Sequence, residues 1–112
     1  MGRGVASGFR PQEGDIVVKE HWGQSGFVNT DLDEQLKHHS VSHVIILALG
    51  ANACLESTGR FAMELGYQVT LVRNATAAFT KEMLHAALEL NGPSYAYPIL
   101  KASELFAVLS SA

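Results

Sequence analysis

Short apolar runs alternate along this chain with segments in which apolar residues recur at helical spacing. The run over 41–49 is mainly apolar, and its pattern is typical of a strand buried on both faces of a parallel sheet. A β-branched piece over 15–19 and a run over 67–72 predict two further strands. A short extended piece over 96–100 follows near the end of the chain.

Amphipathic segments with polar starts fill the gaps between these strands. Thr30 and the acidic residues after it predict the start of a helix over 31–39. Further helices are expected over 55–65, 81–91 and 102–110. Because strands alternate with helices, the pattern predicts an α/β fold, a three-layer Rossmann-like parallel sheet with helices on both faces.

The domain organisation follows from length and from the placement of glycine. Residues 1–14 carry repeated glycines and a proline, so they are expected to form a loop, and 15–112 are expected to form one domain. A chain of 112 residues suits a single small domain, and an apolar content of 47% supports a packed core.

Composition excludes several classes of protein. A net charge of −3 gives no reason to expect nucleic-acid binding. The apolar runs are too short to span a membrane, and the single cysteine rules out an intrachain disulfide and suits the cytoplasm. No pair of histidines has a metal-binding spacing, and we expect neither a metal nor a cofactor.

The single cysteine, Cys54, is the strongest candidate for chemistry. It follows the strand over 41–49 and the small-residue turn over 50–53, at the start of the helix over 55–65. Free N–H groups and the positive end of the dipole at a helix start favour a thiolate, which is a nucleophile. The alternative is a small buried residue that only packs, and spacing leaves both interpretations open.

Lys19 is the candidate partner of this thiol. It ends the strand over 15–19, while Cys54 lies just past the end of another strand. Ligands of parallel sheets bind beyond the carboxyl ends of the strands, so both residues are expected at the same rim. A lysine there would add positive charge beside the thiol and hold a polar substrate. The alternative is a solvated lysine at a strand end.

Other groups near these positions are candidates for binding a substrate. The backbone N–H groups of Ala53 and Cys54 are expected to hold the oxyanion formed when the thiol attacks a carbonyl. Asn52 is interpreted first as a turn former and second as a substrate contact. Four aromatic residues are interpreted as more typical of a core than of ligand contacts: Phe27, Phe61, Tyr67 and Phe79. The candidates for the pocket lining are Gly50, Asn52, His21, Trp22 and Phe27.

Three stretches of the sequence resemble the isochorismatase-like cysteine hydrolases, a superfamily that includes nicotinamidases and N-carbamoyl amidohydrolases. The resemblance lies in Lys19 with the segment over 26–32, in the Cys54 segment over 51–62, and in the strand over 66–72. The segments over 74–79 and 91–96 are similar to one branch of that superfamily. The resemblance covers roughly residues 10–110.

The resemblance implies a triad of aspartate, lysine and cysteine that hydrolyses a small amide or related C–N bond through a thioester. Cys54 matches the nucleophile and Lys19 the lysine, and the family favours a homo-oligomer that acts on a small molecule. The aspartate, which is the general base, normally ends an earlier strand, but only Glu13 and Asp15 precede Lys19 among carboxylates. Asp15 begins the strand over 15–19, about 13 Å from its other end.

The chain therefore resembles the C-terminal two-thirds of a family member, and we expect it to be N-terminally incomplete and weak or inactive alone. Three explanations are open: a truncated gene product, a degenerate paralogue, or a neighbouring chain that supplies the missing strand. We favour the first. The alternative function is a non-catalytic α/β module that oligomerises through exposed sheet edges. Redox sensing ranks last because a second cysteine is absent.

Overall fold

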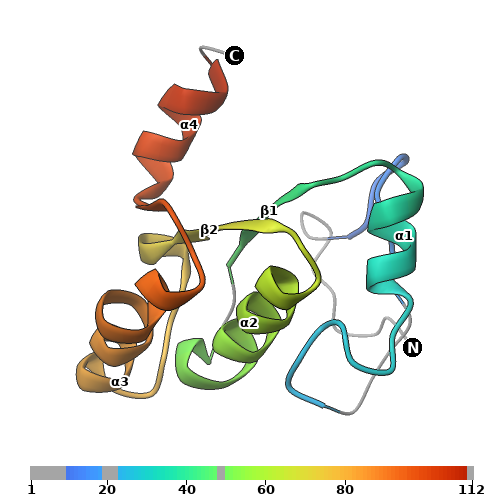
Figure 1. Ribbon diagram of the computed structural model, residues 1–112. Helices are drawn as coiled ribbons and strands as arrows, with labels where there is room; N and C mark the ends of the chain where they lie inside the picture. Colours follow the sequence, from blue (N-terminus) through green and yellow to red (C-terminus); the bar gives the residue numbers. More distant parts are fainter. Residues whose placement is uncertain (1–9, 19–22, 48–49, 111–112) are drawn as a thin grey trace.

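The protein is a parallel sheet flanked by helices (Figure 1). The computed structural model describes residues 10–18, 23–47 and 50–110, without the side chain of Ala75. Adjacent strands are parallel, with Val44 opposite Val69 and Leu71 opposite Ile99, which confirms the α/β class. Within the described residues the strands follow the order β1 (His43–Ile46), β2 (Gln68–Val72) and β3 (Ile99–Leu100).

The helices form where the pattern predicts them. Figure 1 shows α2 and α3 together below the strands, whereas α4 projects above them. The connections from β1 to β2 through α2 and from β2 to β3 through α3 both move one strand along the sheet in the same direction. Right-handed connections of this kind place their helices on the same face, which explains why α2 and α3 lie together. The elements are α1 (Leu32–His38), the π-helical turn η2 (Ala51–Leu55), α2 (Glu56–Glu64), the 3₁₀ turn η3 (Arg73–Ala75), α3 (Lys81–His85), the π-helical η4 (Ala86–Asn91), the 3₁₀ turn η5 (Gly92–Ser94) and α4 (Ala102–Ser110).

The hydrophobic core contains residues from β2 and from the elements that flank it. Val69 and Leu71 alternate along β2 and belong to this core, with Val44 and Ile46 of β1 packed against it. Leu55 reaches it from η2 with none of its surface exposed. The turn that carries Cys54 is therefore fixed to the core through its last residue.

The prediction of a strand over 41–49 that is buried on both faces is wrong in its extent and its burial. The strand covers His43–Ile46, and residues 48–49 lie outside the described residues. Ile45 remains 41% exposed and Leu47 57% exposed. Among the described strands β1 lies at an edge and β2 is central, and the burial expected of a central strand is found in β2 and not in β1.

The predicted strand over 15–19 is also wrong for the part that can be tested. Residues 15–18 form no strand, and Ile16 and Val17 are exposed. Asp15 instead closes a turn, because its carboxylate accepts from the Gln12 amide at 2.8 Å and its own amide donates to the Gln12 carbonyl at 3.0 Å. Lys19 lies outside the described residues.

A close contact between α2 and the segment after η5 gives the first testable prediction. A Cβ on Gly59 would overlap the ring of Tyr95, which is 5% exposed. We expect Gly59→Ala to cost about 1–3 kcal/mol through overpacking, offset by up to about 1 kcal/mol of helix propensity. Urea unfolding followed by circular dichroism measures the difference.

A double-mutant cycle isolates this contact. In a Tyr95→Leu background the smaller side chain leaves room for a Cβ at position 59, so Gly59→Ala should be neutral or stabilising there. An equal loss of stability in both backgrounds would show that the Tyr95 ring is not the cause.

Candidate active site

Cys54 lies in the π-helical turn η2, between the end of β1 and the start of α2, and its side chain is exposed. Gly50 precedes the turn with φ 71° and ψ 57°, a left-handed conformation that glycine adopts without strain. The Gly50 carbonyl accepts from the amides of Ala53 at 2.9 Å and Leu55 at 3.5 Å. The residues on either side of Cys54 are thus anchored on one oxygen, and the interpretation of Cys54 as a buried packing residue is wrong.

The amide of Ala53 is already bonded in this arrangement. Because it donates to Gly50, an oxyanion bound there would have to compete with the Gly50 carbonyl. Asn52 is exposed and Gly50 is half-buried, so both present surface at the turn.

The loop after β2 lies beside the Cys54 turn. The Ala51 amide donates to the Ala77 carbonyl at 2.8 Å, and the buried Thr76 hydroxyl donates to the Val72 carbonyl at 2.8 Å. The first bond holds the loop against the turn, and the second ties the start of the loop to the end of β2. Between the loop and the turn is a cavity of about 330 Å³, and its described lining residues are Gly50, Ala77, Ala78 and Phe79.

Phe79 is the residue at this cavity that sequence reasoning missed. It was interpreted as typical of a core, but 93% of its surface is exposed. The available signal was its position just before Thr80, whose hydroxyl accepts from the Met83 amide at 3.1 Å and begins α3. A residue that precedes a helix cap lies in a loop, where an aromatic side chain is free to face a ligand.

Of the other predicted pocket residues, only Phe27 lies within the described residues, and it does not reach this turn. Phe27 is buried in the core, 7% exposed, with its ring centroid 5.8 Å from that of Tyr67, so it offers no surface to a substrate. His21 and Trp22, like Lys19, lie outside the described residues. The placement of Lys19 beside Cys54 therefore stays a prediction.

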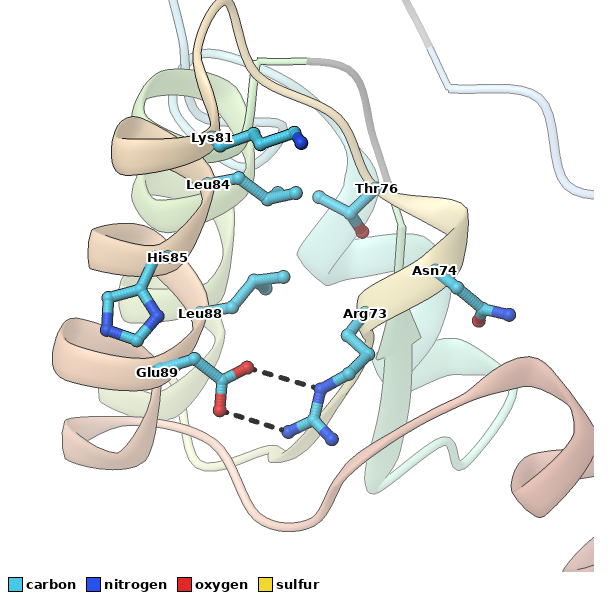
Figure 2. A pocket seen from close by; sticks show the side chains of 8 residues that line it. All are labelled: Arg73, Asn74, Thr76, Lys81, Leu84, His85, Leu88 and Glu89. Atoms are coloured by element: carbon cyan, nitrogen blue, oxygen red, sulfur yellow. Dashed lines mark hydrogen bonds and ion pairs between the residues drawn. The ribbon is translucent and has the colours of Figure 1, made fainter.

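A larger cavity, of about 450 Å³, lies between η3 and the helix formed by α3 and η4 (Figure 2). Arg73 and Glu89 form an ion pair across it, with Nε and Oε2 at 3.2 Å. Lys81 and His85 lie along the same helix, and Leu84 and Leu88 supply the apolar surface (Figure 2). No described residue that lines this larger cavity belongs to the turn that carries Cys54, whereas Gly50, which lines the smaller cavity, directly precedes that turn. The smaller cavity is therefore the one that adjoins Cys54.

The ionisable cluster of Asp33, Lys37 and Tyr67 lies at the opposite end of the sheet from Cys54, because Tyr67 precedes β2. Hydrogen bonds from Lys37 and then Tyr67 lower the pKa of the Asp33 carboxyl, and the bond to Asp33 raises the pKa of Lys37. The Tyr67 hydroxyl donates to Asp33 Oδ1 at 2.6 Å. This cluster links α1 to the sheet and plays a structural part.

No group of three His, Cys, Asp or Glu side chains in the described ranges is arranged to hold a metal ion. In that same part of the chain, none of the helices has the length and apolar content needed to cross a bilayer.

Known proteins share both the sequence and the fold. The family model described as the Isochorismatase domain matches residues 1–103. The uncharacterized isochorismatase family protein YwoC of Bacillus subtilis (strain 168) is 36% identical over 83 residues, which are 73% of this chain and 43% of YwoC. The ureidoacrylate amidohydrolase RutB of Variovorax paradoxus (strain S110) is 39% identical over 68 residues, 61% of this chain and 27% of RutB.

A solved structure extends the likeness to three dimensions. The crystal structure of a cysteine hydrolase from Pseudomonas syringae pv. phaseolicola 1448A matches with a TM-score of 0.86 and 25% identity, covering 96% of this chain and 55% of that one. The chain thus spans about half or less of the length of these proteins.

Proposed function

This chain belongs to the isochorismatase family, and from that premise we propose that it is a cysteine hydrolase that cleaves a small amide or related C–N bond. The observation that carries the proposal is the exposed thiol of Cys54 in a turn anchored on the Gly50 carbonyl. The name of RutB, an amidohydrolase, supports the reaction class. We take the substrate to be a small molecule, bound without a metal or cofactor.

The proposed reaction has two steps. Sγ of Cys54 attacks the carbonyl carbon, the C–N bond breaks, and the amine leaves with a proton. Water then hydrolyses the thioester to the acid and restores the thiol. The Cys54 amide donates a hydrogen bond to the oxyanion. The Ala53 amide can donate a second one only if it breaks its present hydrogen bond to the Gly50 carbonyl.

Two parts of the proposed machinery depend on residues other than Cys54. Lys19 is proposed to supply positive charge beside the thiol. Asp15 is not proposed as a replacement for the family's aspartate base, because it lies in an exposed turn with Gln12 and not at the end of a strand. We therefore propose that the 112-residue chain becomes acylated on Cys54 but turns over slowly, since a missing general base costs about 10²–10⁴-fold.

A comparison of the rates at which Cys54 is acylated and alkylated tests this function. We expect p-nitrophenyl acetate to acylate Cys54 about 10²-fold faster than it acylates the free thiol N-acetylcysteine, because oxyanion donors in the protein act on the attacked carbonyl. Iodoacetamide reacts at a saturated carbon and forms no oxyanion, so its rate reports the thiolate alone. Dividing the acylation rate by the alkylation rate therefore isolates the effect of the oxyanion donors. Intact-mass measurement follows both reactions.

Two controls accompany this measurement. The Cys54→Ala variant should form no adduct, and the chain unfolded in urea should lose the acylation advantage because the turn is gone. An acylation-to-alkylation ratio equal to that of N-acetylcysteine in the folded chain would reject the hydrolase.

A second candidate function rests on the exposed strand edge. β1 is an edge among the described strands, and Ile45 within it and Leu47 just after it are 41% and 57% exposed. An apolar strand at a sheet edge invites pairing with another chain. We propose that the protein is a cytoplasmic homo-oligomer. A module that only oligomerises becomes the better interpretation if the acylation advantage is absent.

A further inference from the structure

We propose that the cavity lined by Gly50, Ala77, Ala78 and Phe79 binds an uncharged apolar group of the substrate, with Phe79 as its main wall; this rests on the proposed hydrolase function. The proposal concerns the class of substrate. It predicts that the bond attacked by Cys54 belongs to a molecule with a ring or branched alkyl group beside the carbonyl.

The position of the cavity supports this assignment. Gly50 belongs both to the cavity lining and to the turn that carries Cys54. Its carbonyl accepts from Ala53 and Leu55, so the backbone of Cys54 lies within about one helical turn of the cavity wall, roughly 5 Å along the axis. The bond from the Ala51 amide to the Ala77 carbonyl brings the opposite wall to the same turn.

The chemistry of the lining selects the ligand. None of the four described lining residues carries a charge or a side-chain hydrogen-bonding group. A carboxylate or amide placed there would lose its hydration without gaining a partner, whereas an apolar group gains from leaving water. A volume of about 330 Å³ is at the lower end for small-molecule sites, so it suits one substituent rather than a whole substrate.

Phe79 is held so that its side chain can cover such a group. The backbone before it is fixed by the Ala51–Ala77 bond, and the backbone after it by the Thr80 cap of α3. The side chain itself is 93% exposed, so an apolar ligand would remove from water a ring that the free protein leaves uncovered.

The selectivity of Cys54 alkylation tests the proposal without requiring turnover. Cys54 is the only cysteine, so intact mass reports on it alone. For each reagent, the alkylation rate of Cys54 is divided by the rate of the same reagent with N-acetylcysteine. We expect this normalised rate to be about tenfold or more higher for N-benzyliodoacetamide than for iodoacetamide, and we call the quotient of the two the benzyl preference. Phe79→Ala should lower this preference to within about threefold of one, the value for the free thiol. Ala78→Leu, which fills the cavity, should lower it too.

A matched control uses another exposed phenylalanine. Phe106 on α4 is 63% exposed and does not line the cavity, so Phe106→Ala should keep the wild-type benzyl preference. Far-UV circular dichroism confirms that each variant is folded.

Two results would overturn the inference. One is a wild-type benzyl preference equal to that of N-acetylcysteine, and the other is an unchanged preference in both Phe79→Ala and Ala78→Leu. Either can occur while acylation by p-nitrophenyl acetate stays fast, so failure of this inference is distinct from failure of the hydrolase function.

Discussion

Replacing Leu71 by alanine is expected to lower the free energy of unfolding by about 2–5 kcal/mol. Leu71 lies on the central strand β2, between Ile46 of β1 and Ile99 of β3, with none of its surface exposed. Truncation removes apolar contacts and leaves a cavity on the face of the sheet, where the Leu71 side chain packs toward Gly92 of η5. A domain of this size has about 5–15 kcal/mol of stability in total, so the loss is a large share of it.

Urea titration followed by circular dichroism measures this loss, and Ile45→Ala is the matched control. Ile45 lies on the neighbouring strand but is 41% exposed, so its truncation should cost less than about 1.5 kcal/mol. Equal losses at both positions would contradict the difference in burial between β2 and β1. A loss at Ile45 that grows with protein concentration would instead point to a second copy covering β1.

The helices and the central strand could be predicted from the sequence because their signals are local. The spacing of Leu32 and Leu36 lies within α1, and the Thr80 hydroxyl caps α3 from a position beside it. β2 is buried at four of its five positions, and three of those four are the aliphatic residues Val69, Leu71 and Val72. In each case the residues that decide the structure are close together in the chain.

The strands whose burial depends on distant partners could not be predicted in the same way. The apolar run that contains β1 indicates burial on both faces, but Ile45 is exposed because no described element covers it. A β-branched run such as 15–18 becomes a strand only beside a partner, and here the Asp15 turn takes its place.

In the candidate site, too, the part formed by neighbouring residues could be predicted from the sequence, and the part formed by distant residues could not. Cys54 was identified from its place after a strand and before a helix. The cavity beside it depends on the bond between Ala51 and Ala77, which are far apart in the sequence. Residue type alone therefore treats Phe27 and Phe79 alike, although one is 7% and the other 93% exposed.

Raising the pH from 10 to 12 is expected to remove about 2–3 kcal/mol of stability through Tyr95. Burial raises the pKa of this tyrosine from 10.0 to about 12; repulsion by Glu56 adds to the shift and attraction by Arg60 opposes it. Between these values the unfolded chain loses the proton while the folded chain keeps it, so the unfolded state is favoured. The contribution is fully present below pH 10 and is lost as the pH rises through 12.

Tyr95→Phe separates this effect from other alkaline titrations. The described residues hold no hydrogen-bond partner for the Tyr95 hydroxyl, so its removal should cost little at pH 8 and can be stabilising. The pKa of Tyr67 is also raised, chiefly by burial, and that contribution remains in both proteins. Urea titrations at pH 9 and pH 11.5 should show a smaller loss of stability in the variant. Equal losses would mean that the Tyr95 hydroxyl ionises in the folded protein as readily as in the unfolded chain.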